Sequence, residues 1–494
     1  MSEKQEALFN MNVHYFKSLF SNSSDVKFAN HFFTSDHSND VISCTIFYSN
    51  VMIDSERLAE TIIKLEDYFL RQMKMKRMRE CFEEDLQFTL VPPTTDKEEI
   101  AEKLFSGYVF VLFEHLGALF AFNLQKIPNR QTEETGSEVS YRGPRDGLVE
   151  DICTNIALIR KRYKTSTLVN ESFELGKRGK TKVSLLYVKD VINNSIVEEV
   201  RRKLSSMADV NVVLGTAELE DTLIEHKFSI VPLLDYSGRP DFLVASLDIG
   251  RFVILVDGAA NAIVGPGNLT HLLSAAEDRH VPYYYVNFEM ILRFLGLTVS
   301  VLLPGFYISL VSFQLEQLPF PFLATITISR QGLPLSPPLE TFLVLTLFEL
   351  FREAGITLPR AIGQTLAVVG GLIIGDAAIR GGLTSPTMLV VSGVTAVATF
   401  TLVNQSLAAS VSIMRLWILL LSSILGLFGF FLGIFSIVLY VSRLQSFGVP
   451  YLAPISPIFF KDLFTGVFIK PYLLKKKRAD ILRTKDKTRL EDKG

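Results

Sequence analysis

The feature that most constrains this chain is the uneven placement of its charged residues. Asp, Glu, Lys and Arg are frequent up to about Asp278 and again after Lys461, but they are sparse between Phe294 and Ser442. Leu, Ile, Val, Phe, Gly and Ala make up most of that middle stretch, a composition typical of membrane segments. The contrast predicts a soluble part and a membrane part.

Four segments of the apolar stretch are predicted to cross a bilayer. Phe294–Phe313 and Leu416–Ser442 carry no charge and reach the ~20 residues that a helix needs to span the hydrocarbon core. Thr384–Val403, rich in Thr, Val and Ala, is the third segment, and Thr365 to about Gly382 is the fourth. The sequence therefore predicts an all-α membrane domain of about four transmembrane helices.

A Pro-rich region, Leu318–Pro359, separates the first span from the one that begins at Thr365. It contains a short apolar helix at Thr341–Phe348, whose apolar run is too short to cross. We therefore expect a re-entrant or interfacial half-helix that is buried among protein neighbours. Four charged residues are expected to shape this half-helix: Glu340, Glu349, Arg352 and Glu353.

Four crossings place both termini on the same side of the membrane. Arg293 and Arg443 flank the outermost spans, and the tail carries Lys475–Arg478, so the positive-inside rule predicts that this side is the cytoplasm. If Thr341–Leu358 crosses the membrane completely, the count becomes five and this topology fails. The N-terminus lacks an uninterrupted apolar run behind a basic start, so no cleaved signal peptide is expected.

The soluble part is predicted to contain two α/β subdomains. In the first, strand-like runs at Val41–Tyr48 and Tyr108–Phe113 alternate with a helical stretch at Ser55–Met73. The following residues lose their hydrophobic periodicity and gather Pro, Gly, Thr and Glu, as a linker does. The predicted parts are an α/β subdomain at 1–125, a linker at 126–139, a second α/β subdomain at 140–285, the helical membrane domain at 286–445 and a basic cytoplasmic tail at 446–494.

Periodic segments also predict the main elements of the second subdomain. A helix that ends near Arg162 places Leu148, Ile152, Ile156 and Ile159 on one face. The predicted strands are Lys182–Val188 and Phe252–Val256, and the further helices are Asn194–Met207 and Leu219–His226.

No motif anchors catalysis or cofactor binding. Gly176 and Gly179 are separated by two residues, whereas the Walker loop needs four, so a solvated hairpin turn is the better interpretation. The seven histidines follow no metal-ligand spacing, and no Gly-x-Ser-x-Gly elbow presents a nucleophile. The three cysteines are expected to be reduced thiols, and the net charge of −2 gives no reason to expect nucleic acid. We therefore predict a protein that is not an enzyme and that binds no cofactor or metal.

Charged residues beside a Gly-Pro turn form a candidate interdomain network. Arg142 and Arg145 stand close to Glu150 and Asp151 in the sequence, so the four side chains could pair at a domain or subunit interface. A capped helix start with exposed charges explains the same residues equally well. The sequence leaves both interpretations open.

The most unusual membrane segment is Gly363–Gly382, which is apolar enough for a bilayer but carries both an acid and a base. On a helical wheel, Gly371, Gly375 and Ala378 fall on one stripe. Small residues at this spacing let another helix approach closely in lipid. The stripe is therefore a candidate surface for helix packing.

The acid and the base of this segment are Asp376 and Arg380, four residues apart. They either neutralise each other within the helix or line a charged mouth of a hydrated path, and both can hold together. In the second interpretation, Val369 and Leu372 close the path as a hydrophobic constriction, which gates by dewetting.

Several separated motifs stand in the order of a known family. They are Arg142-Gly143-Pro144, the run from Thr154 to Arg160, Arg239-Pro240-Asp241, Gly250-Arg251 leading into Ile254 to Asp257, Arg352-Glu353-Ala354-Gly355 with Pro359, Gly363-Gln364-Thr365, and Ser446-Phe447-Gly448 with Pro450-Tyr451. Through them the chain resembles the A subunits of spore germinant receptors, the GerA type of endospore-forming bacteria. The resemblance covers about residues 140 to 455, whereas the first 125 residues and the tail match only in general character.

The resemblance implies cytoplasm-facing N-terminal subdomains and assembly with a transporter-like B subunit, which senses the nutrient, and a lipoprotein C subunit. A subunits of this family are thought to form a nutrient-gated, ion-conducting ring in the spore inner membrane, with five as the expected number of copies. The ring releases monovalent cations and so triggers germination. Carried over by position, the family's pore helix falls on Gln364 to Arg380, with its gate around Leu372.

This chain departs from the family pattern at a few positions. Asp376 stands where a Gln is common, and Arg380 stands where an acid is common. Ala259-Ala260 stands where the family often has a Pro after Asp-Gly. The first two departures bear on conductance and ion preference.

Two rival functions fit the same sequence. A secondary transporter usually shows an inverted repeat with paired broken helices, but this chain has one Pro-broken segment. An accessory or scaffold paralogue of the germination machinery that does not conduct has no sequence feature that separates it from a channel subunit.

Overall fold

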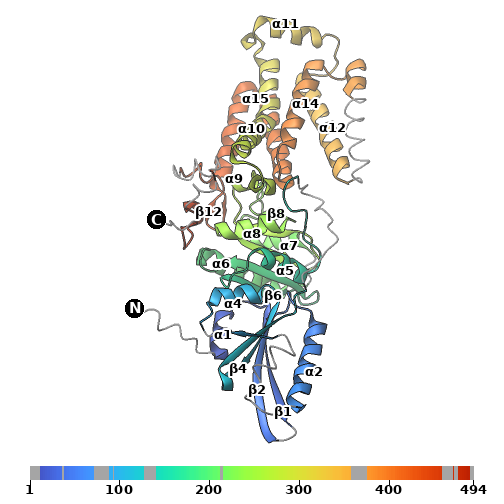
Figure 1. The fold of residues 1–494 in the computed structure, drawn as a ribbon. Helices are drawn as coiled ribbons and strands as arrows, with labels where there is room; N and C mark the ends of the chain where they lie inside the picture. Colours follow the sequence, from blue (N-terminus) through green and yellow to red (C-terminus); the bar gives the residue numbers. More distant parts are fainter. Residues whose placement is uncertain are drawn as a thin grey trace. The chain divides into compact units, whose positions relative to one another are not determined.

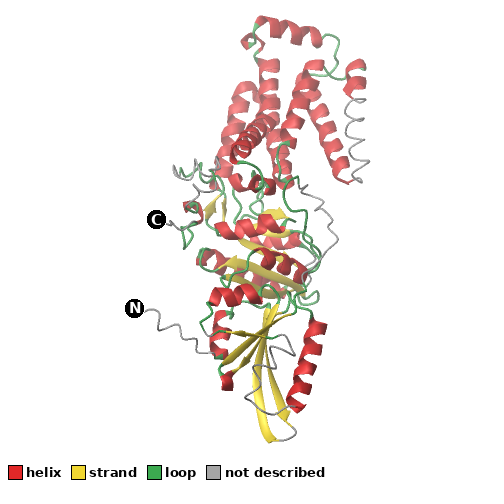
Figure 2. Cartoon of the chain, in the orientation of Figure 1, coloured by secondary structure: helices red, strands yellow, loops and turns green. Residues whose placement is uncertain are grey.

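The structure is a computed structural model that describes residues 12–35, 38–71, 88–92, 94–126, 141–211, 215–357, 375–458, 471 and 477–489. The chain divides into two compact units. Unit 1 comprises residues 1–225, 236–266 and 475–494, and unit 2 comprises residues 226–235 and 267–474. Apart from Asp235, both large sheets belong to unit 1, and the long apolar helices belong to unit 2 (Figures 1 and 2).

An antiparallel five-stranded sheet forms the first half of unit 1, with strand order β1-β2-β4-β5-β3. The strand predicted at Tyr108–Phe113 is confirmed to the residue as β4, and the predicted Val41–Tyr48 lies within β2. The strands are β1 (Val26–Ser35), β2 (Ser38–Ser49), β3 (Thr89–Val91), β4 (Tyr108–Phe113) and β5 (Ala118–Asn123).

Alternating side chains give this sheet a hydrophobic core on each face. On one face, Ile46 and Val111 belong to the same core as Leu65 of α2. On the other face, Phe47 and neighbouring strand residues pack with Phe16 of α1 and with α4. The helices are α1 (Val13–Leu19), α2 (Ser55–Arg71) and α4 (Lys97–Leu104). Helices on both faces explain why the central strands are almost wholly apolar.

The second half of unit 1 is built on a five-stranded sheet with order β6-β7-β9-β10-β8. Helices α5 and α8 pack on β7 and β9, whereas α6 packs on β6 and α7 on β10. The strands are β6 (Leu168–Leu175), β7 (Thr181–Val188), β8 (Asp235–Ser237), β9 (Phe252–Val256) and β10 (Ala262–Gly265). The helices are α5 (Ile152–Arg162), α6 (Asn194–Ser206), α7 (Thr216–Leu223) and α8 (Pro240–Ile249).

Most predicted elements of this half are confirmed. The strand Phe252–Val256 is β9 to the residue, and the predicted strand and helix at 182–188 and 194–207 differ from β7 and α6 by one residue. The helix α7 begins and ends three residues before the predicted one. Gly176 to Lys180 form the hairpin turn between β6 and β7, which excludes a phosphate-binding loop there.

A buried ion pair joins the two halves of unit 1. The Asp25 carboxylate, just before β1, accepts hydrogen bonds from Nε (3.1 Å) and Nη2 (3.0 Å) of Arg160 on α5. The Arg160 guanidinium also lies 3.8 Å from the centre of the Phe105 ring. Both charged side chains are almost fully buried. Of the linker predicted at 126–139, only residue 126 lies within the described residues.

Residues 477–489 of the C-terminal tail pack against the second sheet region. The Arg478 guanidinium bonds the Asp248 carbonyl (2.8 Å) and the Asp486 carboxylate (2.7 Å), and the Lys485 amide bonds the Val191 carbonyl. Gly250 has a φ of 101°, and a Cβ there would lie 2.6 Å from the Thr484 side chain. The tail therefore belongs to the fold of unit 1, and Gly250 makes room for it.

Unit 2 is a bundle of apolar helices. Among the described residues, two of them are long and apolar enough to cross a membrane, Tyr283–Phe313 and Gln405–Arg443. The helix α10 packs against α15 and α14, and α12 packs against α14. The elements are α9 (Leu269–Leu272), α10 (Tyr283–Phe313), α11 (Phe320–Ser329), α12 (Pro337–Thr357), α14 (Pro386–Phe400) and α15 (Gln405–Arg443), with a short β11 (Gln445–Ser446) and β12 (Val449–Pro450) hairpin.

The predicted half-helix is longer than the sequence indicated. We expected eight residues, Thr341–Phe348, but α12 runs for 21 residues, which corresponds to ~31 Å at 1.5 Å per residue. The helix continues because Glu349 and Arg352 find buried partners on neighbouring helices.

The prediction of one straight span at Leu416–Ser442 is wrong, because the chain reverses at Gly426. This residue has φ 61° and ψ −138°, which breaks the helix. Trp417 Nε1 then donates to Ser436 Oγ at 3.0 Å, and Gly433 packs against Ile418. Residues 405–425 and 427–443 are therefore two arms of a tight helical hairpin.

Candidate functional site

Charged side chains are buried inside unit 2 in two clusters on α12. One is centred on Glu340 and the other on Glu349, nine residues further along the helix, or ~13 Å at 1.5 Å per residue. Ionisable groups in an apolar helical bundle are costly unless they are paired, and they commonly mark functional positions. The two clusters are therefore the candidate functional site of this unit.

The Glu340 cluster ties α11, α12 and α14 together. Glu340 is completely buried, and its Oε2 accepts from Arg330 Nη1 at 2.6 Å. Its Oε1 accepts from the amide (2.7 Å) and hydroxyl (2.6 Å) of Ser385 and from the Thr384 hydroxyl (3.0 Å). Ser385 is also the N-cap of α14. Four hydrogen bonds, all from donors to the carboxylate oxygens, leave this carboxylate fully satisfied.

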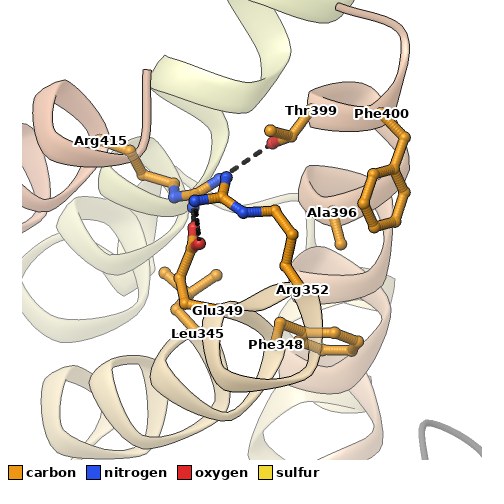
Figure 3. Close-up of a pocket in the computed structure, with 8 residues that line it drawn as sticks. All are labelled: Leu345, Phe348, Glu349, Arg352, Ala396, Thr399, Phe400 and Arg415. Atoms are coloured by element: carbon orange, nitrogen blue, oxygen red, sulfur yellow. Dashed lines mark hydrogen bonds and ion pairs between the residues drawn. The ribbon is translucent and has the colours of Figure 1, made fainter. Parts of the chain in front are cut away.

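The Glu349 cluster joins α12 to α15 and α14 (Figure 3). The Glu349 carboxylate accepts from Arg415 and from Ser412 (2.6 Å) through Oε1, and it pairs with Arg352 (2.7 Å) through Oε2. Arg352 also donates to the Ser412 hydroxyl at 3.0 Å, and Arg415 donates to Thr399 at 3.1 Å. One carboxylate thus serves two guanidinium groups.

A pocket opens beside the Glu349 cluster. It is a partly open hollow of about 280 Å³, a volume that includes adjoining solvent, and its polar side is formed by Glu349, Arg352, Thr399 and Arg415 (Figure 3). The remaining lining residues are apolar: Leu345, Phe348, Ala396 and Phe400. The pocket is therefore a small apolar hollow with positive charge on one side.

The buried face of α14 connects the two clusters with small polar side chains. At helical spacing this face carries Ser385, Met388, Ser392, Thr395 and Thr399, all at most 4% exposed. Thr395 and Thr399 bond the carbonyls of Val391 and Thr395 on their own helix. Small hydroxyl residues of this kind allow close helix packing in lipid.

The described residues include only the end of the predicted pore helix. Val369, Gly371 and Leu372 lie outside the described residues, so the gate at Val369 and Leu372 remains a prediction. Asp376 and Arg380 pair at 2.9 Å, with side chains 57% and 79% exposed. The predicted intrahelical pair is therefore present, and it lies on the exposed side of the helix.

The small residues of that helix pack against other parts of the same chain. Gly375 and Ala378 are buried, and a Cβ on Gly375 would lie 3.3 Å from Leu389 of α14. Glu353, the fourth charge predicted on α12, is exposed.

The four charges of the predicted interdomain network lie on the surface of unit 1. Asp151 is the N-cap of α5, where its carboxylate accepts from the amides of Cys153 (3.3 Å) and Thr154 (2.9 Å). Burial alone would raise the pKa of Asp151, but the hydrogen bonds from Thr154 and Cys153 lower it below 3.8. Arg142, Arg145 and Glu150 are exposed. Nearby, Asp146 pairs with Arg162, with 2.5 Å between a carboxylate oxygen and the guanidinium.

Sequence reasoning missed several members of the two clusters, above all Arg415 and Arg330. Arg415 directly precedes the span predicted to begin at Leu416, so the prediction places it outside the membrane-crossing segments. A lone arginine between two apolar stretches was the available signal. The cluster hydroxyls of Ser385, Thr399 and Ser412 carried no such signal, because buried Ser and Thr are common in helix contacts.

Within the described ranges, no group of three His, Cys, Asp or Glu side chains could hold a metal ion.

Comparison with known proteins gives consistent matches. A family model described as Bacillus/Clostridium GerA spore germination protein matches residues 14–481. Spore germination protein XA of Bacillus anthracis is 39% identical over 472 residues, which cover 95% of each chain. Spore germination protein GerLA of Bacillus cereus is 31% identical over 445 residues, which cover 90% of each chain.

Among solved structures, the N-terminal domain of the A subunit of the Bacillus megaterium spore germinant receptor GerK3 is 22% identical. The match covers 53% of this chain and 95% of that chain, with a TM-score of 0.39, which is too low to carry an argument.

Proposed function

We propose that this chain, which belongs to the Bacillus/Clostridium GerA spore germination protein family, is the A subunit of a nutrient-sensing germinant receptor and lines its ion path. In this proposal several copies, five by family resemblance, assemble around an axis in the spore inner membrane. A transporter-like B subunit senses the nutrient, and a lipoprotein C subunit completes the receptor. Nutrient binding opens the path to monovalent cations and starts germination.

The observation that carries the channel proposal is the exposure of the Asp376–Arg380 pair. The pair belongs to a helix of the apolar unit, yet the two side chains are 57% and 79% exposed. Charged groups with that exposure on an apolar helical bundle need water or another subunit beside them. A path around an axis supplies both, because copies of one chain can close into a ring through heterologous contacts.

The proposed path follows Gln364 to Arg380. The buried Gly375 and Ala378 attach this helix to α14 of the same chain, while Asp376 and Arg380 point away from it. A helix over this range places Leu372 and Val369 one and two turns before Asp376, as the hydrophobic gate.

The described helices also support cytoplasmic termini. The reversal at Gly426 adds one crossing to the four expected from sequence, and a full crossing by α12 adds another. Six is an even number, so both termini remain on one side, which the positive charges near Arg293 and Arg443 favour as the cytoplasm.

The test is to replace Leu372 by Ala and by Ser and to measure cation release from spores without nutrient. Leu420→Ala, on the exposed face of α15, is the matched control because the same side-chain atoms are removed. We expect spontaneous leak from both Leu372 variants, larger for Ser because it wets the constriction, and none from the control. Wild-type leak and wild-type nutrient response in both variants would contradict the gate.

The Asp376→Asn variant tests whether Asp376 lines the ion path or only forms a structural ion pair with Arg380. If Asp376 lines the path, the variant keeps its level in the membrane and changes the ratio of released Na⁺ to K⁺. Loss of the protein from the membrane with an unchanged ratio would assign the pair to structure alone.

A further inference from the structure

The charges that line the pocket beside Glu349 do not balance. Two guanidinium groups, Arg352 and Arg415, face a single carboxylate, Glu349. The next acid on α12, Glu353, is exposed and is not among the lining residues. With all three groups ionised, the pocket carries a net charge of about one positive unit.

The carboxylate has no capacity left for the excess charge. Glu349 Oε1 already accepts from Arg415 and Ser412, and Oε2 faces Arg352. The Nε of Arg415 is buried and has no hydrogen-bond partner among the described residues. A buried donor on a charged group that lacks an acceptor is costly, so the Arg415 guanidinium is incompletely satisfied by the described residues.

The pocket lies at a depth where water screens charge poorly. On α10, Gly296 faces Ala398 and Thr401 of the α14 end, and Gly305 faces Ile418 and Ser422 of α15. Thr399 and Arg415, which line the pocket, therefore lie level with the first half of the span predicted at Phe294–Phe313. A surplus positive charge in this medium is strongly unfavourable without a counter-charge.

We propose that this pocket binds one small monovalent anion of the chloride class, held by Arg415 and Arg352. A single negative charge neutralises the excess positive charge of the cluster. The walls of Leu345, Phe348 and Phe400 favour a weakly hydrated halide over a strongly hydrated phosphate. The hollow of about 280 Å³, part of which is open to solvent, is small and suits a small anion better than a nucleotide.

The anion would act as a ligand that holds three helices in place. Its two arginines come from α12 and α15, and Thr399 of α14 completes the polar side of the pocket. Occupancy would therefore stabilise the packing of α12 against the hairpin. The site is distinct from the proposed path at Gln364–Arg380, so it stands or falls independently of conduction.

The experiment measures the thermal stability of the full chain in detergent, in chloride, bromide and gluconate salts at equal ionic strength. We expect chloride and bromide to raise the melting temperature over gluconate by about 2–4 °C, with saturation as the halide concentration increases. A melting temperature that is the same in all three salts would overturn the proposal and would assign the pocket to water.

Three variants sharpen the test because they change the pocket charge in known directions. Arg415→Gln makes the cluster neutral, so the halide increment should vanish, and the apparent halide affinity should fall by about tenfold or more. Glu349→Gln doubles the excess charge, so the increment should grow. Arg380→Gln removes an exposed arginine outside the pocket and should keep the wild-type increment.

Arg352→Gln is the second variant if Arg415→Gln does not fold, since Arg352 lines the same pocket and is more exposed. Trp417, the chain's single tryptophan, bonds Ser436 across the hairpin, so an unchanged emission maximum confirms that a variant has folded. A full halide increment in a folded Arg415→Gln or Arg352→Gln protein, or a smaller one in Glu349→Gln, would contradict the proposed site.

Discussion

Unit 1 and unit 2 each bury an arginine against a carboxylate, but they satisfy the two charges differently. In unit 1, Arg160 pairs with Asp25 through two hydrogen bonds to the carboxylate, and no other described guanidinium pairs with this carboxylate. Arg160 also donates to the Leu168 carbonyl (2.8 Å), and the Phe105 ring lies against its face. In unit 2, Arg415 shares Glu349 with Arg352 and keeps an unpartnered Nε among the described residues.

The difference shows what each pair can do. A one-to-one buried pair with every donor used has a single arrangement, so it fixes the two halves of unit 1 against each other. A shared carboxylate leaves charge unmatched, so its environment can be completed by something from outside the chain. The first is suited to a rigid scaffold, and the second is suited to a site that responds to a ligand.

The largest expected effect comes from breaking the one-to-one pair. Asp25→Asn leaves Arg160 charged and buried, which should cost about 3–5 kcal/mol. Hydrogen exchange of the β6 and β7 amides in the full chain measures this as faster opening. The exposed Glu102→Gln is the control. The double variant Asp25→Leu with Arg160→Met should recover most of the loss, and a failure to recover would mean that the pair contributes more than charge neutralisation.

Glu340 tests whether a carboxylate of unit 2 can behave like Asp25. It is completely buried with four donor atoms from Arg330, Thr384 and Ser385. Glu340→Gln should destabilise unit 2 by about 2 kcal/mol, less than Asp25→Asn because Arg330 keeps 16% exposure. The melting temperature of the detergent-solubilised chain measures the loss, with the exposed Glu353→Gln as control. A loss of stability that depends on the halide concentration would mean that the Glu340 cluster also responds to an anion, as proposed for the Glu349 cluster.

An exposed carboxylate should contribute less to stability, and it should do so through hydrogen bonds to backbone amides. Asp151 caps α5 by accepting from two backbone amides. Asp151→Ala should therefore cost about 1 kcal/mol of stability, seen as faster hydrogen exchange of the first α5 amides. Asp151→Asn keeps the capping oxygen and should stay within a few tenths of a kcal/mol of the wild type. An equal loss in both variants would restore the interdomain network as the better interpretation of this residue.

The smallest effect concerns the half-buried Glu171, which bonds Arg201 Nε at 2.9 Å and the Tyr187 hydroxyl at 2.6 Å. Burial alone would raise the pKa of Glu171, but hydrogen bonds from Arg201 and Tyr187 hold it below 4.5. Its stabilising effect is therefore present above pH 4.5 and is lost as the pH falls through the lowered pKa.

Melting curves of the wild type and Glu171→Gln should thus differ slightly at pH 7 and converge as the pH falls below the lowered pKa of Glu171. A difference in melting temperature that grows on acidification would mean that the pKa of Glu171 is raised rather than lowered.

The fold could be predicted from sequence wherever one local pattern decides the structure. The strands β4 and β9 match the prediction to the residue because short β-branched and aromatic runs, bounded by polar residues, have one stable use in a sheet. The start of α10 was placed 11 residues too late, at Phe294 rather than Tyr283, because Arg293 seemed to end the apolar run. In the structure Arg293 is neutralised by Asp278 at 2.7 Å, so the helix extends past it.

The candidate site could be predicted only in part. Glu340, Glu349 and Arg352 stood out as charges next to an apolar run, but their partners Arg330, Ser385 and Arg415 are 10 to 66 residues away in the chain. A sequence pattern records spacing along one helix, whereas these contacts depend on how several helices pack. The reversal at Gly426 was missed for a related reason, since a turn inside an apolar run needs no polar residue when its backbone is bonded within the two arms.

By itself, the sequence determined that this chain has two α/β sheet regions, an apolar helical region with a few embedded charges, and the motifs of its family. Periodicity and composition fix these features because they follow from the local cost of exposing apolar groups or burying charges. Tertiary structure alone decided which charges meet, that Arg160 would be matched one to one, and that two arginines would share Glu349. Those outcomes depend on the distance between helices, since the free energy of a buried charge is set by its immediate neighbours.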